Sequence, residues 1–189
     1  MELRVFHLTL FCFLVNLLGA FIGTMPVAAK ERTLTNFETE HLSLGWQVVN
    51  DDVMGGRSTS NFRLVASVLS FFGTINTEGG GFASIRTRHS DFNLQGINNL
   101  RLRVRSDGRR YTALLRSKNT RISYRMDFST RSGRWEEALL PITSFQASWR
   151  GLKLNEPPIA PEDITQIGIM IADGQDGDFQ LEIDWIKVQ

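Results

Sequence analysis

The stretch Leu100-Arg-Leu-Arg-Val-Arg105 decides the fold that we expect for this chain. Its apolar residues alternate one by one with arginines. This period of two places the apolar side chains on one face of a β-strand and the arginines on the other. Asp107-Gly108 follows as a tight hairpin turn, and Tyr111-Thr-Ala-Leu-Leu-Arg116 resumes the sheet. The stretch therefore predicts half-buried antiparallel strands.

Short strand patterns of this kind continue on both sides of the stretch. They cover residues 44–50, 62–64, 68–75, 82–87, 122–128, 135–140, 164–171 and 179–187. Glycine and aspartate turns separate them, and no segment keeps a helical period over any length. Many short strands with such turns are typical of all-β sandwiches. We therefore predict an antiparallel β-sandwich of jelly-roll type.

The first 29 residues have a different composition from the rest. One arginine precedes a nearly continuous apolar run from Val5 to Gly23, and Val27-Ala-Ala29 offers small residues for cleavage. This pattern is typical of a secretory signal peptide, and an uncleaved membrane anchor is the alternative. We predict a signal peptide over 1–29, one domain over 30–189, and export to the periplasm or the cell exterior. The only cysteine, Cys12, lies in the leader, so the domain has no disulfide.

Charge is balanced overall but uneven along the chain. With 21 basic and 20 acidic residues, bulk charge gives no reason to expect nucleic-acid binding. Between Arg101 and Arg134, however, eleven basic residues stand against Asp107 and Asp127. On one sheet face they would form a basic surface for an acidic protein, anionic lipid or polyanionic glycan. The alternative is a solvated face whose arginines pair with the acidic C-terminal strands.

A polar, glycine-rich loop, Val49 to Ser60, interrupts the strand pattern and is the main candidate for function. Asp51 and Asp52 could serve as an acid/base pair, as acceptors for sugar hydroxyls or as metal ligands. Alternatively, a carboxylate caps backbone N–H groups around Gly55-Gly56. A catalytic dyad would require the loop to bend, because neighbouring residues of an extended chain point in opposite directions.

Four further residues complete the predicted binding set. Arg57 and Arg86 could hold an anion through two parallel hydrogen bonds, or could pair with Asp51 or Asp52. Ser58 lies in the same loop. Trp149, in an irregular segment, is the candidate for an exposed stacking contact, whereas Trp46 alternates with core positions.

The sequence offers little sign of a metal, a cofactor or a catalytic centre. The domain has no cysteine and only two histidines, so a zinc site is not predicted. Glu38 and Asp184 are the oxygen ligands to test for a structural calcium, with ordinary surface carboxylates as the alternative. Gly79-Gly-Gly81 lacks the lysine of a phosphate loop and is interpreted as a hairpin turn. We predict no cofactor and no catalytic residues, and a hydrolase using Asp51 or Asp52 is a minor alternative.

Several motifs resemble one known family. They are Trp46-Gln-Val-Val-Asn-Asp-Asp-Val-Met-Gly-Gly-Arg-Ser58, Gly80-Gly-Phe-Ala-Ser-Ile-Arg86, Arg103-Val-Arg-Ser-Asp-Gly-Arg-Arg-Tyr111, Ser148-Trp-Arg-Gly151, Ile167-Gly-Ile-Met-Ile-Ala-Asp-Gly174 and Gly177-Asp-Phe-Gln-Leu-Glu-Ile-Asp-Trp-Ile186. In this order they resemble the complex I intermediate-associated protein family, the thirty-kilodalton assembly factor. The resemblance implies a galactose-binding-like jelly roll related to carbohydrate-binding modules. It also implies a role in assembling NADH:ubiquinone oxidoreductase.

Three functional hypotheses follow from these features. The first is a non-catalytic module that binds a partner protein, such as a respiratory-complex subunit, through the Asp51–Ser58 loop region and Trp149. The second is an exported module that binds carbohydrate with the same loops. The third is the hydrolase. Membrane association through an uncleaved N-terminus or the basic residues between Arg101 and Arg134 would be compatible with the first.

Overall fold

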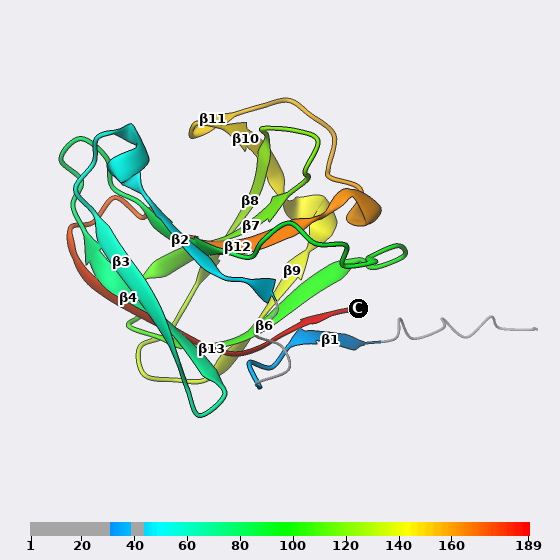
Figure 1. The fold of residues 1–189 in the computed structure, drawn as a ribbon, viewed down its shortest axis with the longest axis horizontal. Helices are drawn as coiled ribbons and strands as arrows, with labels where there is room; N and C mark the ends of the chain where they lie inside the picture. Colours follow the sequence, from blue (N-terminus) through cyan, green and yellow to red (C-terminus); the bar gives the residue numbers. More distant parts are fainter. Residues whose placement is uncertain (1–30, 39–43) are drawn as a thin grey trace, which may run out of the picture.

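The computed structural model describes residues 31–38 and 44–189. The predicted signal peptide lies outside the described residues. The described part of the chain folds into two antiparallel sheets that face each other (Figure 1). The prediction of an all-β sandwich is therefore confirmed. No helix in these residues is long and apolar enough to cross a bilayer.

The first sheet runs in the order β3-β4-β13-β6-β9, and β1 also pairs with β13. Its strands are β1 (Arg32–Thr35), β3 (Thr59–Val65), β4 (Val68–Ile75), β6 (Asn99–Ser106), β9 (Glu136–Pro141) and β13 (Gly177–Val188). The stretch Leu100–Arg105 lies in β6, between β13 and β9. Its leucines and valine are 0–1% exposed, and its arginines face outward. The alternation of apolar residues and arginines thus correctly predicts which side chains of β6 are buried.

The second sheet runs in the order β11-β10-β8-β7-β12-β5-β2. Its strands are β2 (Gln47–Asn50), β5 (Ala83–Arg86), β7 (Arg110–Arg116), β8 (Ser123–Ser129), β10 (Gln146–Trp149), β11 (Leu152–Lys153) and β12 (Gln166–Ile171). Short 3-10 helices within the described part of the chain are η2 (Asp51–Met54), η3 (Ile142–Ser144) and η4 (Pro161–Asp163). The second sheet carries both loops that the sequence singled out.

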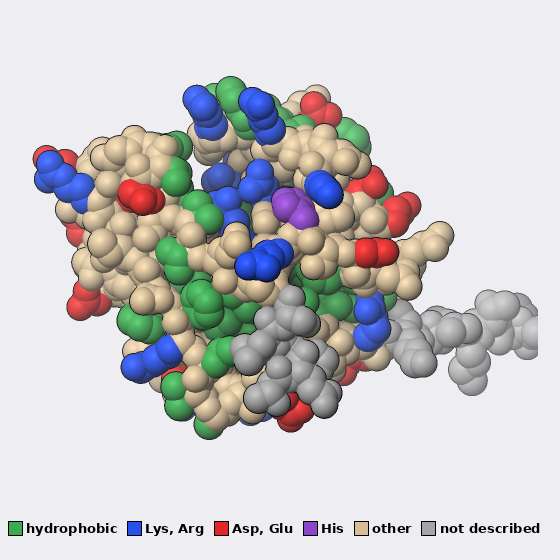
Figure 2. Space-filling model, viewed as in Figure 1, with side chains coloured by type: hydrophobic (Ala, Val, Ile, Leu, Met, Phe, Trp, Pro, Cys, Tyr) green, Lys and Arg blue, Asp and Glu red, His purple; other side chains and the backbone are tan. Residues whose placement is uncertain are grey.

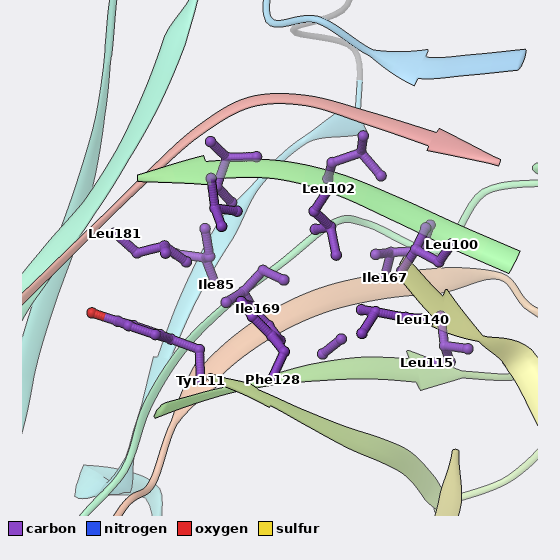
Figure 3. Close-up of a cluster of buried hydrophobic side chains, with 14 of the residues drawn as sticks. Ile85, Leu100, Leu102, Tyr111, Leu115, Phe128, Leu140, Ile167, Ile169 and Leu181 are labelled. Atoms are coloured by element: carbon purple, nitrogen blue, oxygen red, sulfur yellow. The ribbon is translucent and has the colours of Figure 1, made fainter. Parts of the chain in front are cut away.

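One core fills the space between the sheets. Leu100, Leu102 and Leu181 come from the first sheet and meet Ile167 and Ile169 of the second (Figure 3). Trp46, predicted to be core, is 9% exposed and packs against Phe37 with ring centroids 6.1 Å apart. Burial of each such side chain contributes about 1.5–3 kcal/mol, so the two inner faces hold the sandwich together.

The predicted hairpin at Asp107-Gly108 is wrong. β6 and β7, which flank this turn, belong to different sheets, so the chain crosses from one layer to the other there. Contacts distant in sequence determine the crossing. The Asp107 carboxylate accepts hydrogen bonds from the backbone N–H of Gln180 at 2.8 Å and from the Tyr111 hydroxyl at 3.1 Å. These bonds tie the turn to β13 and to the core.

The crossing also divides the arginines of residues 101–134 between two sheets, so they do not form one basic face, which was one of the two interpretations. On β6, Arg101 pairs with Glu31 and Glu137, Arg103 with Asp184, and Arg105 with Glu182. The acidic partners come from the N-terminal segment, β9 and β13. The outer face of the first sheet is therefore a paired, solvated surface, which was the alternative interpretation. Arg116 and Arg125 lie on the second sheet.

Candidate functional site

The loop after β2 is a single 3-10 turn, η2, closed by Gly55 in the left-handed region with a φ of +88°. A side chain with a Cβ seldom adopts this conformation, which explains a glycine at this position. The turn leaves Val53 and Met54 pointing into solvent, 68% and 60% exposed. The loop therefore displays apolar side chains, a feature that its polar composition concealed.

Asp51 is the fixed centre of this loop. It is fully buried, and its carboxylate accepts hydrogen bonds from the Ser58 backbone N–H at 2.9 Å and the Ser58 hydroxyl at 2.6 Å. The backbone N–H groups of Gly81 and Phe82 donate to the same carboxylate at 2.6 and 3.3 Å. Burial alone would raise the pKa of Asp51, but the bonds from Ser58 and Gly81 outweigh it, and the net pKa is lowered.

Two glycines make room for this carboxylate. A Cβ on either Gly56 or Gly80 would overlap the Asp51 side chain. The Gly79–Gly81 run is thus more than a turn, because it wraps the carboxylate that closes the η2 loop. Asp51 therefore has the structural role among those considered, and it is not available to contact a ligand. Asp52, beside it, is exposed, so the two carboxylates do not form a catalytic dyad.

The remaining predicted residues of the loop separate into inner and outer ones. Ser58 is 3% exposed and belongs to the Asp51 network. Arg57 pairs with Glu78 at 3.3 Å on the surface, and neither it nor Arg86 pairs with Asp51 or Asp52. The alternative of such pairs is therefore not what the structure shows, because N–H and hydroxyl donors occupy the Asp51 oxygens and Arg57 pairs with Glu78.

A hollow on the outer face of the second sheet separates the η2 loop from the β10–β11 hairpin. It consists of two adjoining cavities of about 360 and 170 Å³, which share Arg125, Gly151, Met170 and Ala172. The smaller cavity reaches Met54 of η2 on one side and Arg150 of the hairpin on the other. Figure 2 shows Lys and Arg side chains gathered in a recess of this face. The structure thus places the two predicted loops across one hollow.

The β10–β11 hairpin beside the hollow is also apolar at its tip, although Trp149 and Leu152 line neither cavity. Trp149 is 42% exposed and Leu152 is 67% exposed. The Arg150 guanidinium lies 5.0 Å from the centre of the Trp149 ring, with Arg150 at a φ of +48°. We call Val53, Met54, Trp149 and Leu152 the apolar rim. These four are most of the exposed large apolar side chains in residues 31–38 and 44–189; the others are Val65 and Leu139.

Two arginines that the sequence did not single out, Arg116 and Arg125, lie with the predicted Arg86 on the outer face between these loops. Arg125 lines both cavities, and Arg86 lines the smaller one. Arg116 lies two residues along β7 from Leu114, which is the cross-strand partner of Arg125. Strand alternation could have placed all three side chains outward, but it could not show that β5, β7 and β8 lie together.

A second polar cluster explains two of the shared motifs. Arg109 donates to both Asp173 oxygens, at 2.9 and 2.7 Å, and to the carbonyl oxygens of Gln175, Gly177 and Asp178. The Asp173 bond raises the pKa of Arg109, while the same pair and the Gln175 N–H lower the pKa of Asp173 against its burial. This clamp joins the sheet-crossing turn to the β12–β13 turn, so these motifs have a structural role.

The two carboxylates considered for calcium lie apart from this hollow. Asp184 on β13 accepts a hydrogen bond from Arg103 at 2.7 Å, and Glu38 is exposed just before the undescribed residues 39–43. Among the residues that the structure describes, no group of three or more potential metal ligands occurs.

Comparison with known proteins identifies the family. The model of the family described as complex I intermediate-associated protein 30 matches residues 35–183. The chain belongs to the complex I intermediate-associated protein 30 family. The resemblance inferred from the motifs is therefore confirmed. The match includes the η2 loop, the arginines of the hollow and the β10–β11 hairpin.

Named members of the complex I intermediate-associated protein 30 family are similar over most of this chain. The mitochondrial protein of that name from Mus musculus is 29% identical over 169 residues, 76% of this chain and 51% of the mouse protein. The one from Drosophila melanogaster is 30% identical over 171 residues, 76% of this chain and 58% of the fly protein. This chain thus spans about half the length of these relatives. Their names place them in mitochondria, which contradicts the predicted export.

Solved structures show what the complex I intermediate-associated protein 30 domain resembles in shape. The family 11 carbohydrate-binding module of a Clostridium thermocellum cellulase superposes with a TM-score of 0.57, at 18% identity, over 85% of this chain and 95% of the module. The same module in complex with a mixed-linked tetrasaccharide gives 0.56, at 17% identity, over 84% and 94%. This likeness confirms a jelly-roll fold like that of carbohydrate-binding modules.

Proposed function

We propose that this domain is a non-catalytic binding module that takes part in assembling NADH:ubiquinone oxidoreductase by holding a partner protein against the apolar rim. The observation that carries the proposal is that both loops flanking one hollow expose large apolar side chains, of which Met54 lines the hollow itself. Isolated exposed apolar residues are common on protein surfaces, whereas a group of them beside a concavity marks an interaction site.

Family membership supports the choice of partner. The relatives that this chain matches are named for association with an intermediate of complex I. The buried Asp51 carboxylate and its glycines supply the rigidity that a binding loop needs, since they hold η2 in one conformation. Asp52, Arg57, Arg86 and Trp149 border this surface and complete the proposed contact set, while Asp51 and Ser58 position it.

A crosslinked pull-down from native membranes tests this function. The rim variant carries Met54→Ser and Leu152→Ser, and the matched control carries Val65→Ser and Leu139→Ser, which remove exposed apolar side chains elsewhere. Subunits of NADH:ubiquinone oxidoreductase should be recovered with the wild type and the control, and be depleted at least about tenfold with the rim variant. Recovery of no respiratory subunit with any of the three proteins would contradict the proposal.

A carbohydrate ligand is the second candidate. The larger cavity is lined by hydroxyl, amide and carboxylate groups of Thr112, Asp127, Gln146 and Ser148, close to the exposed Trp149 hairpin. Such polar groups beside an aromatic ring suit a sugar. Binding on a glycan array, lost on Trp149→Ala, is the expected result. A blank array, repeated with calcium present, would eliminate this candidate.

A further inference from the structure

The arginines Arg86, Arg116 and Arg125, which we call the arginine cluster, come together because of strand order. Arg86 on β5 is opposite Gly168 on β12, Gly168 is opposite Leu114 on β7, and Leu114 is opposite Arg125 on β8. These four residues form one row across the outer face. Arg116 belongs to the next row, opposite Gln166 and Ser123.

A glycine in this row gives the cluster its shape. A Cβ on Gly168 would lie 3.0 Å from Cγ of Arg86 and 2.8 Å from the carbonyl oxygen of Ile85. The stem of Arg86 therefore lies against the bare backbone of β12. Leu114 and Met170 also point away from the core, yet they are only 2% and 4% exposed. The floor of the hollow is thus covered, and the guanidinium groups are partly withdrawn from solvent.

The cluster lacks acidic partners among the residues that the structure describes. None of its three arginines makes an ion pair there. Arg86 donates Nε to the Ser84 hydroxyl at 3.1 Å, and Arg116 reaches only the Gln166 side-chain oxygen, at 3.5 Å. The Nε atoms of Arg116 and Arg125 are buried without a hydrogen-bond partner. Buried donors without acceptors are uncommon in folded proteins, and an absent ligand is one reason for them.

The nearest acidic side chain on this face is already engaged. Asp127 accepts the Thr112 hydroxyl at 2.7 Å and lies 3.7 Å from Arg110. The cluster also differs from the arginines of β6, each of which has a carboxylate partner. Burial, followed by the charges of Arg116 and Arg125, lowers the pKa of Arg86 to about 10. Burial also lowers the pKa of Arg125, and the charge of Asp127, which acts in the opposite direction, does not outweigh it. The free protein thus keeps three cations close together at a cost in free energy.

We propose that the arginine cluster is an oxyanion-binding site in which Arg86, Arg116 and Arg125 take a carboxylate or phosphate group that enters through the hollow. Guanidinium groups bind such oxyanions through paired, charge-assisted hydrogen bonds. An oxyanion would satisfy the buried Nε donors and neutralise the repulsion between the cations. The site lies between the two loops that carry the apolar rim. The proposal rests on the proposed function only for the source of the oxyanion, which would be an acidic side chain of the partner protein.

Calorimetry on the purified protein at low salt tests the site without any partner. Inorganic phosphate is the first probe, and a synthetic peptide of alternating glutamate and leucine is the second, with a glutamine–leucine peptide as its neutral control. Saturable binding of phosphate or of the glutamate peptide is expected, and the tighter of the two identifies the source. Arg86→Gln and Arg125→Gln should each weaken it at least about tenfold. Arg63→Gln, an exposed arginine on β3 of the other sheet, should leave it unchanged.

Thermal unfolding of the same variants separates loss of the site from loss of the fold. Removing one of three repelling cations should leave the melting temperature of the free protein unchanged or higher, while the stabilisation by the anion is lost. The proposal is overturned if neither probe binds the wild type, or if Arg86→Gln and Arg125→Gln bind as the wild type does. These results do not depend on recovery of respiratory subunits, so the two proposals can fail separately.

Discussion

At the scale of single residues, the main feature is a carboxylate used for positioning. Asp51 lies in the most distinctive motif of the chain, yet it is fully buried and accepts four hydrogen bonds from the protein itself. The exposed residues around it, Val53 and Met54, owe their position to this network. Arg109 also has a positioning role. At the sheet-crossing turn it donates hydrogen bonds to three carbonyl oxygens and to Asp173.

Asp51→Asn should destabilise the protein by about 3 kcal/mol at neutral pH, because an amide nitrogen would face N–H donors that need an acceptor. Urea denaturation measures this, and Asp52→Asn, at an exposed position, is the matched control with a change below about 0.5 kcal/mol. The pKa of Asp51 is lowered on folding, so its contribution is present above the unfolded value and is lost as pH falls through the folded one. The two curves should therefore begin to converge only below about pH 4 and meet below the folded pKa. A gap that stays constant well below about pH 4 would argue against an ionised Asp51.

Arg109→Lys should cost about 2–3 kcal/mol, since an ammonium group cannot reproduce the paired bonds to Asp173 together with those to the carbonyl oxygens. The neighbouring Arg110→Lys is the control, because Arg110 is half exposed and lies 3.7 Å from Asp127. Its effect should be small. Equal midpoints for the two variants in thermal unfolding would show that the clamp contributes little.

At the scale of elements, the alternation of apolar and polar residues in the sequence predicts which side chains of a strand are buried, but it fails at single positions. β6 is buried and exposed in turn, as its sequence predicts. β13 has a register shift between Ile183 and Trp185, so Asp184 is an extra residue there. Strict alternation along this strand, inferred from its sequence, is therefore interrupted. The shift leaves Asp184 beside Arg103 and Trp185 beside Arg101 on the outer face.

Leu102→Ala in β6 should cost about 3 kcal/mol, because it leaves a cavity between the sheets. Leu139→Ala in the adjacent β9 is the matched control. Leu139 is 53% exposed and lies on the outer face, so its removal should change stability by less than about 0.5 kcal/mol. Chemical denaturation of both variants measures the difference. Similar losses would mean that the inner face of β6 does not carry the core.

At the scale of the whole molecule, the sequence predicts the class of fold and the loops, but not how the layers connect. Asp107-Gly108 has the residues of a hairpin, and the same residues suit a turn that crosses between sheets. The choice depends on Gln180 and Asp173, more than sixty residues away. Likewise, Arg116 and Arg125 were visible as outward positions, but the arginine cluster exists only because β12 lies between β5 and β7.

Site-specific photo-crosslinking tests most directly the claim that a partner lies across the hollow. A photoreactive phenylalanine derivative is placed at Met54, at Leu152 or, as the control, at Val65, and the protein is irradiated in native membranes. Crosslinks from both rim positions to the same respiratory-complex subunit, with none from Val65, are the predicted result. Crosslinks from Val65 alone, or from Met54 and Leu152 to unrelated proteins, would contradict the account.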